Sequence, residues 1–188
     1  LEMIQFFLFI IFLFFVLFYY MFGFQIRFLC FFFGLLTILS FFNIIYSYYL
    51  NLYLNLDTYY WCLIISLVIS VLFYKIKISR KKPNIYNKIL TVFFGYLSLP
   101  FILCLPFYFS IYNITFLNSY FEAVSGFTST GFTIFENIKH IDQSLILWRS
   151  SSQWIGGLYF LFSIIFLIDI YDENFKKSLT NFISFNSS

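Results

Sequence analysis

The chain has 188 residues, of which 62% are hydrophobic and 10% are charged, and its formal net charge at neutral pH is +3. Soluble domains are about half apolar and about one quarter charged, so a soluble domain cannot bury so much apolar surface. The composition therefore excludes a soluble enzyme, a disordered chain and a nucleic-acid-binding protein. It indicates a protein embedded in a lipid bilayer.

Five segments are predicted to span the membrane, because each is close to the run of about 20 apolar residues that a spanning helix needs. The first lacks a basic start and a small-residue cleavage site, which favours a span over a signal peptide. The third is near the lower limit of length, and the fourth is too long for one span. The five segments are 3–26, 28–56 (apolar core 28–49), 58–74, 89–121 and 144–168.

The basic residues predict the orientation of these spans. Six of the 11 basic residues lie between Lys75 and Lys88, in the connection between the third and fourth spans. Arg27 marks the connection after the first span, and Lys176 and Lys177 follow the last one. With five spans all three sites fall on one side, which the positive-inside rule predicts to be the cytoplasm. A basic run also suits nucleic-acid binding, but its place between two spans favours the orientation signal.

The segment between the last two spans, which this orientation places outside, contains a short predicted helix at 119–127. Asn118 or Ser119 is a suitable N-cap, and Glu122 lies in the first turn, where the helix dipole favours an acid. Gly126 is expected to end the helix. The helix is too short to cross a membrane.

The predicted helix is followed by residues 128–133, Thr-Ser-Thr-Gly-Phe-Thr, which suit neither a helix nor a lipid-facing strand. Irregular backbone is tolerated at membrane depth only inside protein or beside a water-filled cavity. A short helix that enters and an extended stretch that returns would form a re-entrant loop. In potassium filters the carbonyl oxygens of such a stretch replace the water shell of the ion. Gly131 supplies the necessary dihedral freedom, and a plain turn is the alternative.

Residues 121–131 read Phe-Glu-Ala-Val-Ser-Gly-Phe-Thr-Ser-Thr-Gly, and residues 147–157 read Leu-Trp-Arg-Ser-Ser-Ser-Gln-Trp-Ile-Gly-Gly. Residues 105–107, Leu-Pro-Phe, precede them. In this order the three stretches resemble the first pore-loop repeat of the Trk/Ktr/HKT superfamily of potassium transporters, most of all its bacterial TrkH branch. The resemblance covers residues 88–168.

The resemblance implies an all-α integral membrane protein with about five transmembrane helices, one re-entrant pore helix and a filter loop. Residues 1–82 are expected to hold the N-terminal transmembrane helices and to end in a basic cytoplasmic loop. Residues 83–172 are expected to form the first helix–pore-loop–helix repeat. Residues 173–188 are expected to be a cytoplasmic tail or the start of a missing remainder. The implied location is the inner (cytoplasmic) membrane, as a multi-pass protein.

The resemblance also implies potassium uptake by the pore-forming subunit of a transporter, or by its N-terminal fragment. Potassium is then the substrate, held by the backbone carbonyls of Ser129, Thr130 and Gly131, and no covalent cofactor is expected. The implied partners are the lipid bilayer, further pore repeats from the same gene or other subunits, a second copy in a homodimer, and a cytosolic nucleotide-binding subunit of the TrkA or KtrA type. The implied selectivity filter consists of Thr128, Ser129, Thr130, Gly131 and Phe132.

The sequence departs from the family pattern in four ways. It contains one repeat, so we expect the chain either to be a fragment of a longer protein or to assemble with other repeats. Tyr159 stands where the family often has glycine, and Ser129 stands where threonine is more usual. Three predicted spans precede the repeat, where the TrkH branch commonly has two.

Several residues of the last span are predicted to support the loop. Arg149 lies about 7 Å below the outer end of that span, where it either reaches the surface or pairs with Glu122. Gln153, one turn further, is a candidate hydrogen-bond donor to the loop backbone. Gly156 and Gly157 favour close helix packing, with a hinge as the alternative. The predicted supports of the pore loop are Glu122, Gly126, Arg149 and Gln153.

No zinc-binding, phosphate-binding or nucleophile motif appears, so nothing in the sequence supports an enzyme. Cys30, Cys62 and Cys104 lie in apolar runs, which is typical of small buried hydrophobic side chains. Two functions of different classes remain open. One is a potassium-transport subunit, and the other is a membrane scaffold or degenerate remnant that keeps the fold and conducts nothing.

Overall fold

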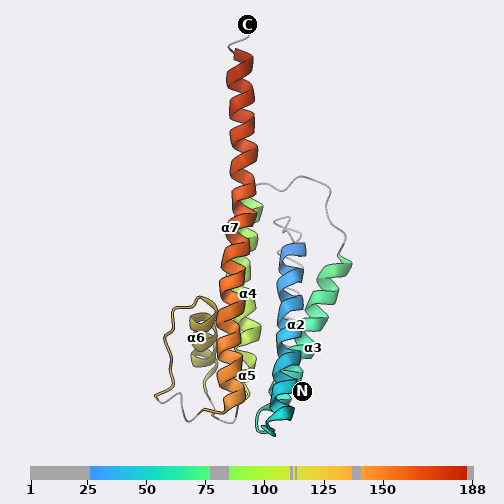
Figure 1. The fold of residues 1–188 in the computed structure, drawn as a ribbon, viewed down its shortest axis with the longest axis vertical. Coiled ribbons are helices and arrows are strands. Elements are labelled where there is room, and N and C mark those ends of the chain that lie inside the picture. The colour runs from blue at the N-terminus through green and yellow to red at the C-terminus, as the bar shows by residue number, and fades with distance from the viewer. Residues whose placement is uncertain (1–25, 77–84, 111, 113, 137–140, 186–188) are drawn as a thin grey trace.

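The computed structural model describes residues 26–76, 85–110, 112, 114–136 and 141–185, with side chains through residue 168. Within these residues the protein is helical and contains no strand (Figure 1), so the prediction of an all-α fold is confirmed. The helices are α2 (Ile26–Tyr49), α3 (Leu56–Lys75), α4 (Ile85–Leu103), α5 (Leu105–Tyr108), α6 (Phe116–Phe127) and α7 (Gln143–Phe185).

Four helical segments are long and apolar enough to cross a membrane. They are α2, α3, the pair α4–α5 and the first 26 residues of α7, which end at Ile168. This is a multi-pass membrane protein. The predicted first span at 3–26 lies outside the described residues except for Ile26, as do residues 77–84 of the basic loop. α7 continues as a helix beyond Ile168 and extends past the other helices (Figure 1).

Basic residues of three helices lie at a common end of the bundle. The start of α2, the end of α3 and the start of α4 lie together at the end opposite the α2–α3 connection (Figure 1), and they carry Arg27, Lys75 and Lys88. Lys88, which the sequence places in the connection between two spans, lies in the first turn of α4. It is 8% exposed, and its ammonium lies 5.1 Å from the centre of the Phe166 ring, a cation–π geometry.

Helices α2 and α3 form an antiparallel hairpin with small polar residues at the contact. Thr37 Oγ1 donates to Ser66 Oγ at 3.1 Å, and Ser70 Oγ donates to the carbonyl of Cys30 at 3.3 Å. Small residues at such contacts let transmembrane helices approach closely. The predicted burial of the cysteines holds for Cys62 and Cys104, which are fully buried, whereas Cys30 is half-buried.

The predicted fourth span is divided among α4, α5 and α6, and two prolines lie near the break between α4 and α5. Pro100 lies inside α4, and the helix ends at Leu103. Pro106 then stands in the first turn of α5, where its missing N–H costs no hydrogen bond. The carbonyl of Leu103, freed at the helix end, accepts a hydrogen bond from Trp148 Nε1 at 3.0 Å. The chain can therefore turn toward α6 without an unpaired buried carbonyl at this position.

A buried polar network fixes the start of α7 against the α2–α3 hairpin. Tyr59 donates its hydroxyl to Ser144 Oγ at 2.9 Å, and Ser144 Oγ donates to Asp142 Oδ2 at 2.7 Å. Asn55 Nδ2 donates to the same carboxylate oxygen at 2.9 Å. The helix that carries Arg149 therefore begins at a fixed position.

Candidate functional site

Helix α6 starts earlier than the sequence predicts because Thr115 is its N-cap. Thr115 Oγ1 accepts a hydrogen bond from the backbone N–H of Asn118 at 3.4 Å, and α6 begins at Phe116. The predicted caps Asn118 and Ser119 are therefore wrong, since both lie inside the helix. Glu122 falls in the second turn rather than the first.

Helix α6 runs beside α7 and in the same direction. Glu122 contacts Arg149, and five residues further along α6 the carbonyl of Phe127 lies against Gly156. Gly156 is 13 residues beyond Gln143, the first residue of α7. At 1.5 Å per residue, α6 therefore ends about 20 Å along α7 from its start.

The chain after α6 turns back and runs beside the helix it has just left. Ser125 Oγ donates to the carbonyl of Phe132 at 2.6 Å, and the N–H of Ile134 donates to Glu122 Oε2 at 3.0 Å. The order of partners is reversed, so residues 128–134 return toward the start of α6. A short helix followed by a returning segment is the arrangement that the sequence predicts.

The helix is ended by a Schellman motif centred on Ser129. The N–H of Ser129 donates to the carbonyl of Gly126 at 3.0 Å, and the N–H of Thr130 donates to the carbonyl of Ser125 at 3.1 Å. Ser129 has φ +56°, in the left-handed region that glycine usually occupies. The prediction that Gly126 ends the helix is therefore wrong. Sequence reasoning missed Ser129 in this role because the residue gives no signal for a positive φ.

Gly131 also has a positive φ, +81°, and a Cβ there would meet no atom within 4 Å. Glycine adopts a positive φ without steric cost, whereas the positive φ of Ser129 costs some steric strain at its Cβ. Residues 128–132 are all exposed in this chain, Phe132 by 68%.

The backbone N–H and C=O groups of residues 128–132 differ in their hydrogen bonding. The N–H groups of Thr128, Ser129 and Thr130 all point back and donate to the last turn of α6. Among the described residues, no donor is hydrogen-bonded to the carbonyl oxygens of 128–131. The carbonyl of Phe132 differs, since it accepts from Ser125 Oγ and, at 3.4 Å, from the guanidinium of Arg149. Four successive carbonyls thus lack a described donor at the negative end of the α6 dipole.

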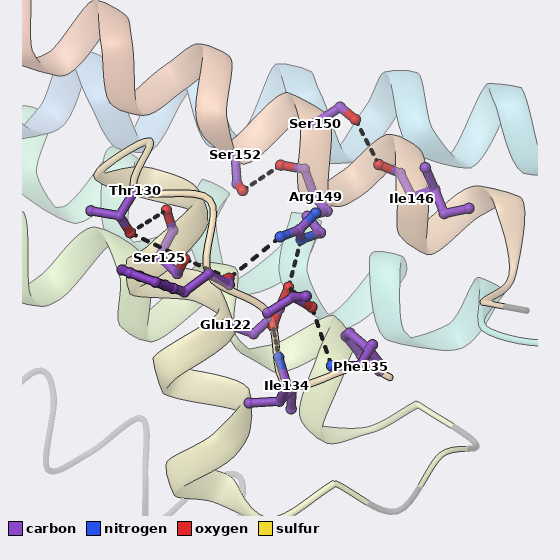
Figure 2. Close-up of polar contacts among 11 residues, drawn as sticks. Glu122, Ser125, Thr130, Ile134, Phe135, Ile146, Arg149, Ser150 and Ser152 are labelled. Carbon is purple, nitrogen blue, oxygen red and sulfur yellow. Dashed lines mark hydrogen bonds and ion pairs between the residues drawn. The ribbon is translucent and has the colours of Figure 1, made fainter. Parts of the chain in front are cut away.

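Glu122 and Arg149 form the predicted contact, and both side chains are also hydrogen-bonded to the returning segment (Figure 2). Arg149 Nε donates to Glu122 Oε1 at 2.5 Å, and the two side chains are 14% and 0% exposed. The same carboxylate accepts from Thr133 Oγ1 at 3.2 Å and from the N–H of Ile134. A buried carboxylate with three donors satisfies its charge without water. Gln153 makes no hydrogen bond to the described part of the loop.

Comparisons with known proteins show sequence similarity to cation transporters over part of the chain. No family model and no solved structure matches the chain. The uncharacterized cation transporter MJ1485 of Methanocaldococcus jannaschii is 28% identical over 127 residues, covering 66% of this chain and 27% of the relative. The Trk system potassium uptake protein TrkI of Halomonas elongata is 38% identical over 64 residues, 34% of this chain and 12% of the relative. TrkG of Escherichia coli is 39% identical over 46 residues, 24% of this chain and 10% of the relative.

The chain is related to the Trk-type cation transporters. It spans 27% or less of the length of each of these relatives.

Two glycines bring α6 against α7. A Cβ at Gly156 would overlap the carbonyl oxygen of Phe127, a backbone atom that cannot move aside. A Cβ at Gly126 would lie 2.5 Å from Ser152 Oγ, which is the end of a small side chain. Gly156 therefore acts by close packing, the first of the two predicted alternatives. Gly126 is a contact residue of α6, and Gly157 faces open space in this chain.

Proposed function

We propose that this chain supplies one pore-lining repeat of a Trk-type potassium uptake protein. Residues 83–172 form the helix–pore-loop–helix repeat, residues 1–82 hold the preceding transmembrane helices, and residues 173–188 continue on the cytoplasmic side. The basic ends of α2, α3 and α4 face the cytoplasm. Helix α6 and the segment after it then enter the membrane from outside and return to the same side.

The observation that carries this proposal is the asymmetry of the backbone after α6. The N–H groups of Thr128, Ser129 and Thr130 are held by α6, which fixes the segment, while no described donor meets the carbonyls of 128–131. Carbonyl oxygens presented in this way are the ligands that replace the water shell of a potassium ion. TrkI and TrkG, two relatives of this chain, are potassium uptake proteins by name.

The filter is formed by Thr128, Ser129, Thr130, Gly131 and Phe132, and potassium is the substrate. Ser129, Thr130 and Gly131 offer their carbonyls to the ion, and the positive φ of Gly131 sets the direction of the last of these. Phe132 anchors the strand, because its carbonyl is already bonded to Ser125 and Arg149.

Gln153 lies one turn beyond Arg149 on α7 and makes no hydrogen bond to the described part of the loop. Two kinds of contact hold the filter in place: Glu122 and Arg149 pair and bond to residues 132–134, and Gly126 and Gly156 let α6 approach α7. These residues position the loop and do not touch the ion.

One strand cannot surround an ion, so the pore requires further repeats, from the same gene or from other subunits. The bilayer covers the exposed apolar faces of α2 and α3. A second copy of the protein and a cytosolic nucleotide-binding subunit of the TrkA or KtrA type complete the assembly that we propose. The location is the cytoplasmic membrane.

The test is growth of a cell that lacks its own potassium uptake systems, at low external potassium, with the complete gene product that contains this chain. We expect growth to be restored by the wild-type protein. Membrane insertion without any growth or potassium uptake would contradict the proposal and would favour the non-conducting scaffold or remnant.

A further inference from the structure

Tyr159 is a fully buried aromatic side chain of α7 at the meeting point of four helices. Its ring centre lies 4.7 Å from that of Phe32 on α2 and 4.9 Å from that of Tyr96 on α4. It also lies 5.4 Å from the ring centre of Phe127, the last residue of α6. Aromatic pairs at these distances contribute beyond their buried area. The end of α6 therefore rests on the ring of Tyr159.

The hydroxyl of Tyr159 fixes the ring on α4. It donates a hydrogen bond to the backbone carbonyl of Val92 at 2.9 Å. A Cβ at Gly95 would overlap the tyrosine oxygen. The hydroxyl therefore fits only because residue 95 is glycine. A buried hydroxyl without a partner is costly, so this bond strongly favours one position of the ring.

The fixed ring lies directly behind the start of the filter segment. Phe127 is followed at once by Thr128, Ser129 and Thr130, whose N–H groups bond to the last turn of α6. A displacement of the Phe127 ring thus moves the helix end to which these three residues are attached. Within the described residues, Tyr159 makes no hydrogen bond or ring contact with residues 128–132 themselves.

We propose that Tyr159 is a positioning residue that sets the depth at which α6 ends, and through it the place of the filter strand. The inference rests on the proposed function for its consequence in transport, but its structural part is testable without transport. The hydroxyl anchors Tyr159 to α4 through its hydrogen bond to the Val92 carbonyl, and the ring limits how far Phe127 can move toward α4.

Tyr96 provides a matched control. Its ring belongs to the same cluster, 5.7 Å from that of Phe127 and 4.9 Å from that of Tyr159. Among the described residues its hydroxyl has no hydrogen-bond partner. Tyr96→Phe therefore removes a hydroxyl from the same cluster without removing an anchor, whereas Tyr159→Phe removes the anchor and keeps the ring.

The experiment is hydrogen exchange, followed by mass spectrometry, on the complete protein in lipid nanodiscs. Amide exchange reports local opening. With Tyr159→Phe we expect exchange in peptides covering 128–134 to be about two- to tenfold faster, the range for the net loss of one hydrogen bond. Peptides from α3 are expected to be unchanged, and Tyr96→Phe is expected to match the wild type throughout.

Two results would overturn the inference. One is equal exchange at 128–134 in Tyr159→Phe and Tyr96→Phe. The other is acceleration of the same size in α3, which would mean a general loss of stability. Because Tyr159→Phe keeps the ring and the volume of the side chain, folding of this variant is expected, and a failure to fold would also count against a local positioning role.

Potassium uptake with sodium competition provides the second measurement on the same variants. We expect Tyr159→Phe to lower the preference for potassium over sodium at unchanged expression, and Tyr96→Phe to leave it unchanged. If the wild-type protein moves no potassium while the exchange result is as expected, the proposed function fails and the positioning role stands. If the wild type transports potassium but both variants behave alike in exchange and in uptake, the positioning role fails and the proposed function stands.

Discussion

The pair formed by Glu122 and Arg149 predicts a large loss of stability when the carboxylate is neutralised. Glu122→Gln keeps the shape of the side chain but replaces one acceptor oxygen by a donor, so that Arg149 or the N–H of Ile134 loses its partner. Breaking a buried ion pair by removing one partner costs about 3–5 kcal/mol. Arg149 is 14% exposed and keeps the carbonyl of Phe132, so we expect the lower end, about 3 kcal/mol.

The assay is the apparent melting temperature and the folded yield of the detergent-solubilised protein. Glu136→Gln is the matched control, because Glu136 is an exposed acid in the same loop. We expect Glu122→Gln to lower both quantities and Glu136→Gln to leave them unchanged. The charge swap Glu122→Arg with Arg149→Glu is expected to recover only part of the loss, since arginine accepts no hydrogen bond from Ile134. Equal melting temperatures for the two Gln variants would refute the stabilising role of the Glu122–Arg149 pair.

The remaining predictions concern helix contacts and topology. Gly126→Ala is expected to reduce folded yield, and Ser152→Ala in the same chain to restore it by removing the clashing oxygen; no restoration would place the clash elsewhere. Gly156→Ala meets backbone instead, so no side-chain change on α6 is expected to rescue its yield, and a wild-type yield would contradict the packing. In intact cells a cysteine at Ser79 is expected to resist an impermeant thiol reagent and one at Asn137 to react; the opposite pattern would reverse the orientation.

The helical architecture could be predicted from the sequence because lipid imposes simple requirements. Apolar length locates α2, α3 and the membrane-spanning part of α7, and basic residues mark the ends of α2, α3 and α4 that lie together. The Glu122–Arg149 contact was also predictable, because two opposite charges at similar depth have few other partners. The break between α4 and α5 was predictable from Pro100 and Pro106, which lack an N–H donor.

Other features depend on tertiary contacts that the sequence does not show. Thr115 was missed as a cap because Asn118 and Ser119 are of residue types with a higher propensity for that position than threonine. The positive φ of Ser129 is set by the Schellman motif and not by the residue itself. The role of Gly126 is visible only once α7 lies against α6.

Ion discrimination by a Gly131→Ser variant of the complete transporter tests the central claim most directly. A side chain at φ +81° costs about 1–2 kcal/mol, so the strand is expected to relax and to shift the Gly131 carbonyl. Gly34→Ser is the control, since a Cβ at Gly34 meets only Ser70 Oγ at an ordinary 3.6 Å. We predict that Gly131→Ser inserts normally but lowers the preference for potassium over sodium by about tenfold or more, with Gly34→Ser like the wild type. An unchanged preference in Gly131→Ser would show that residues 128–132 are not the filter.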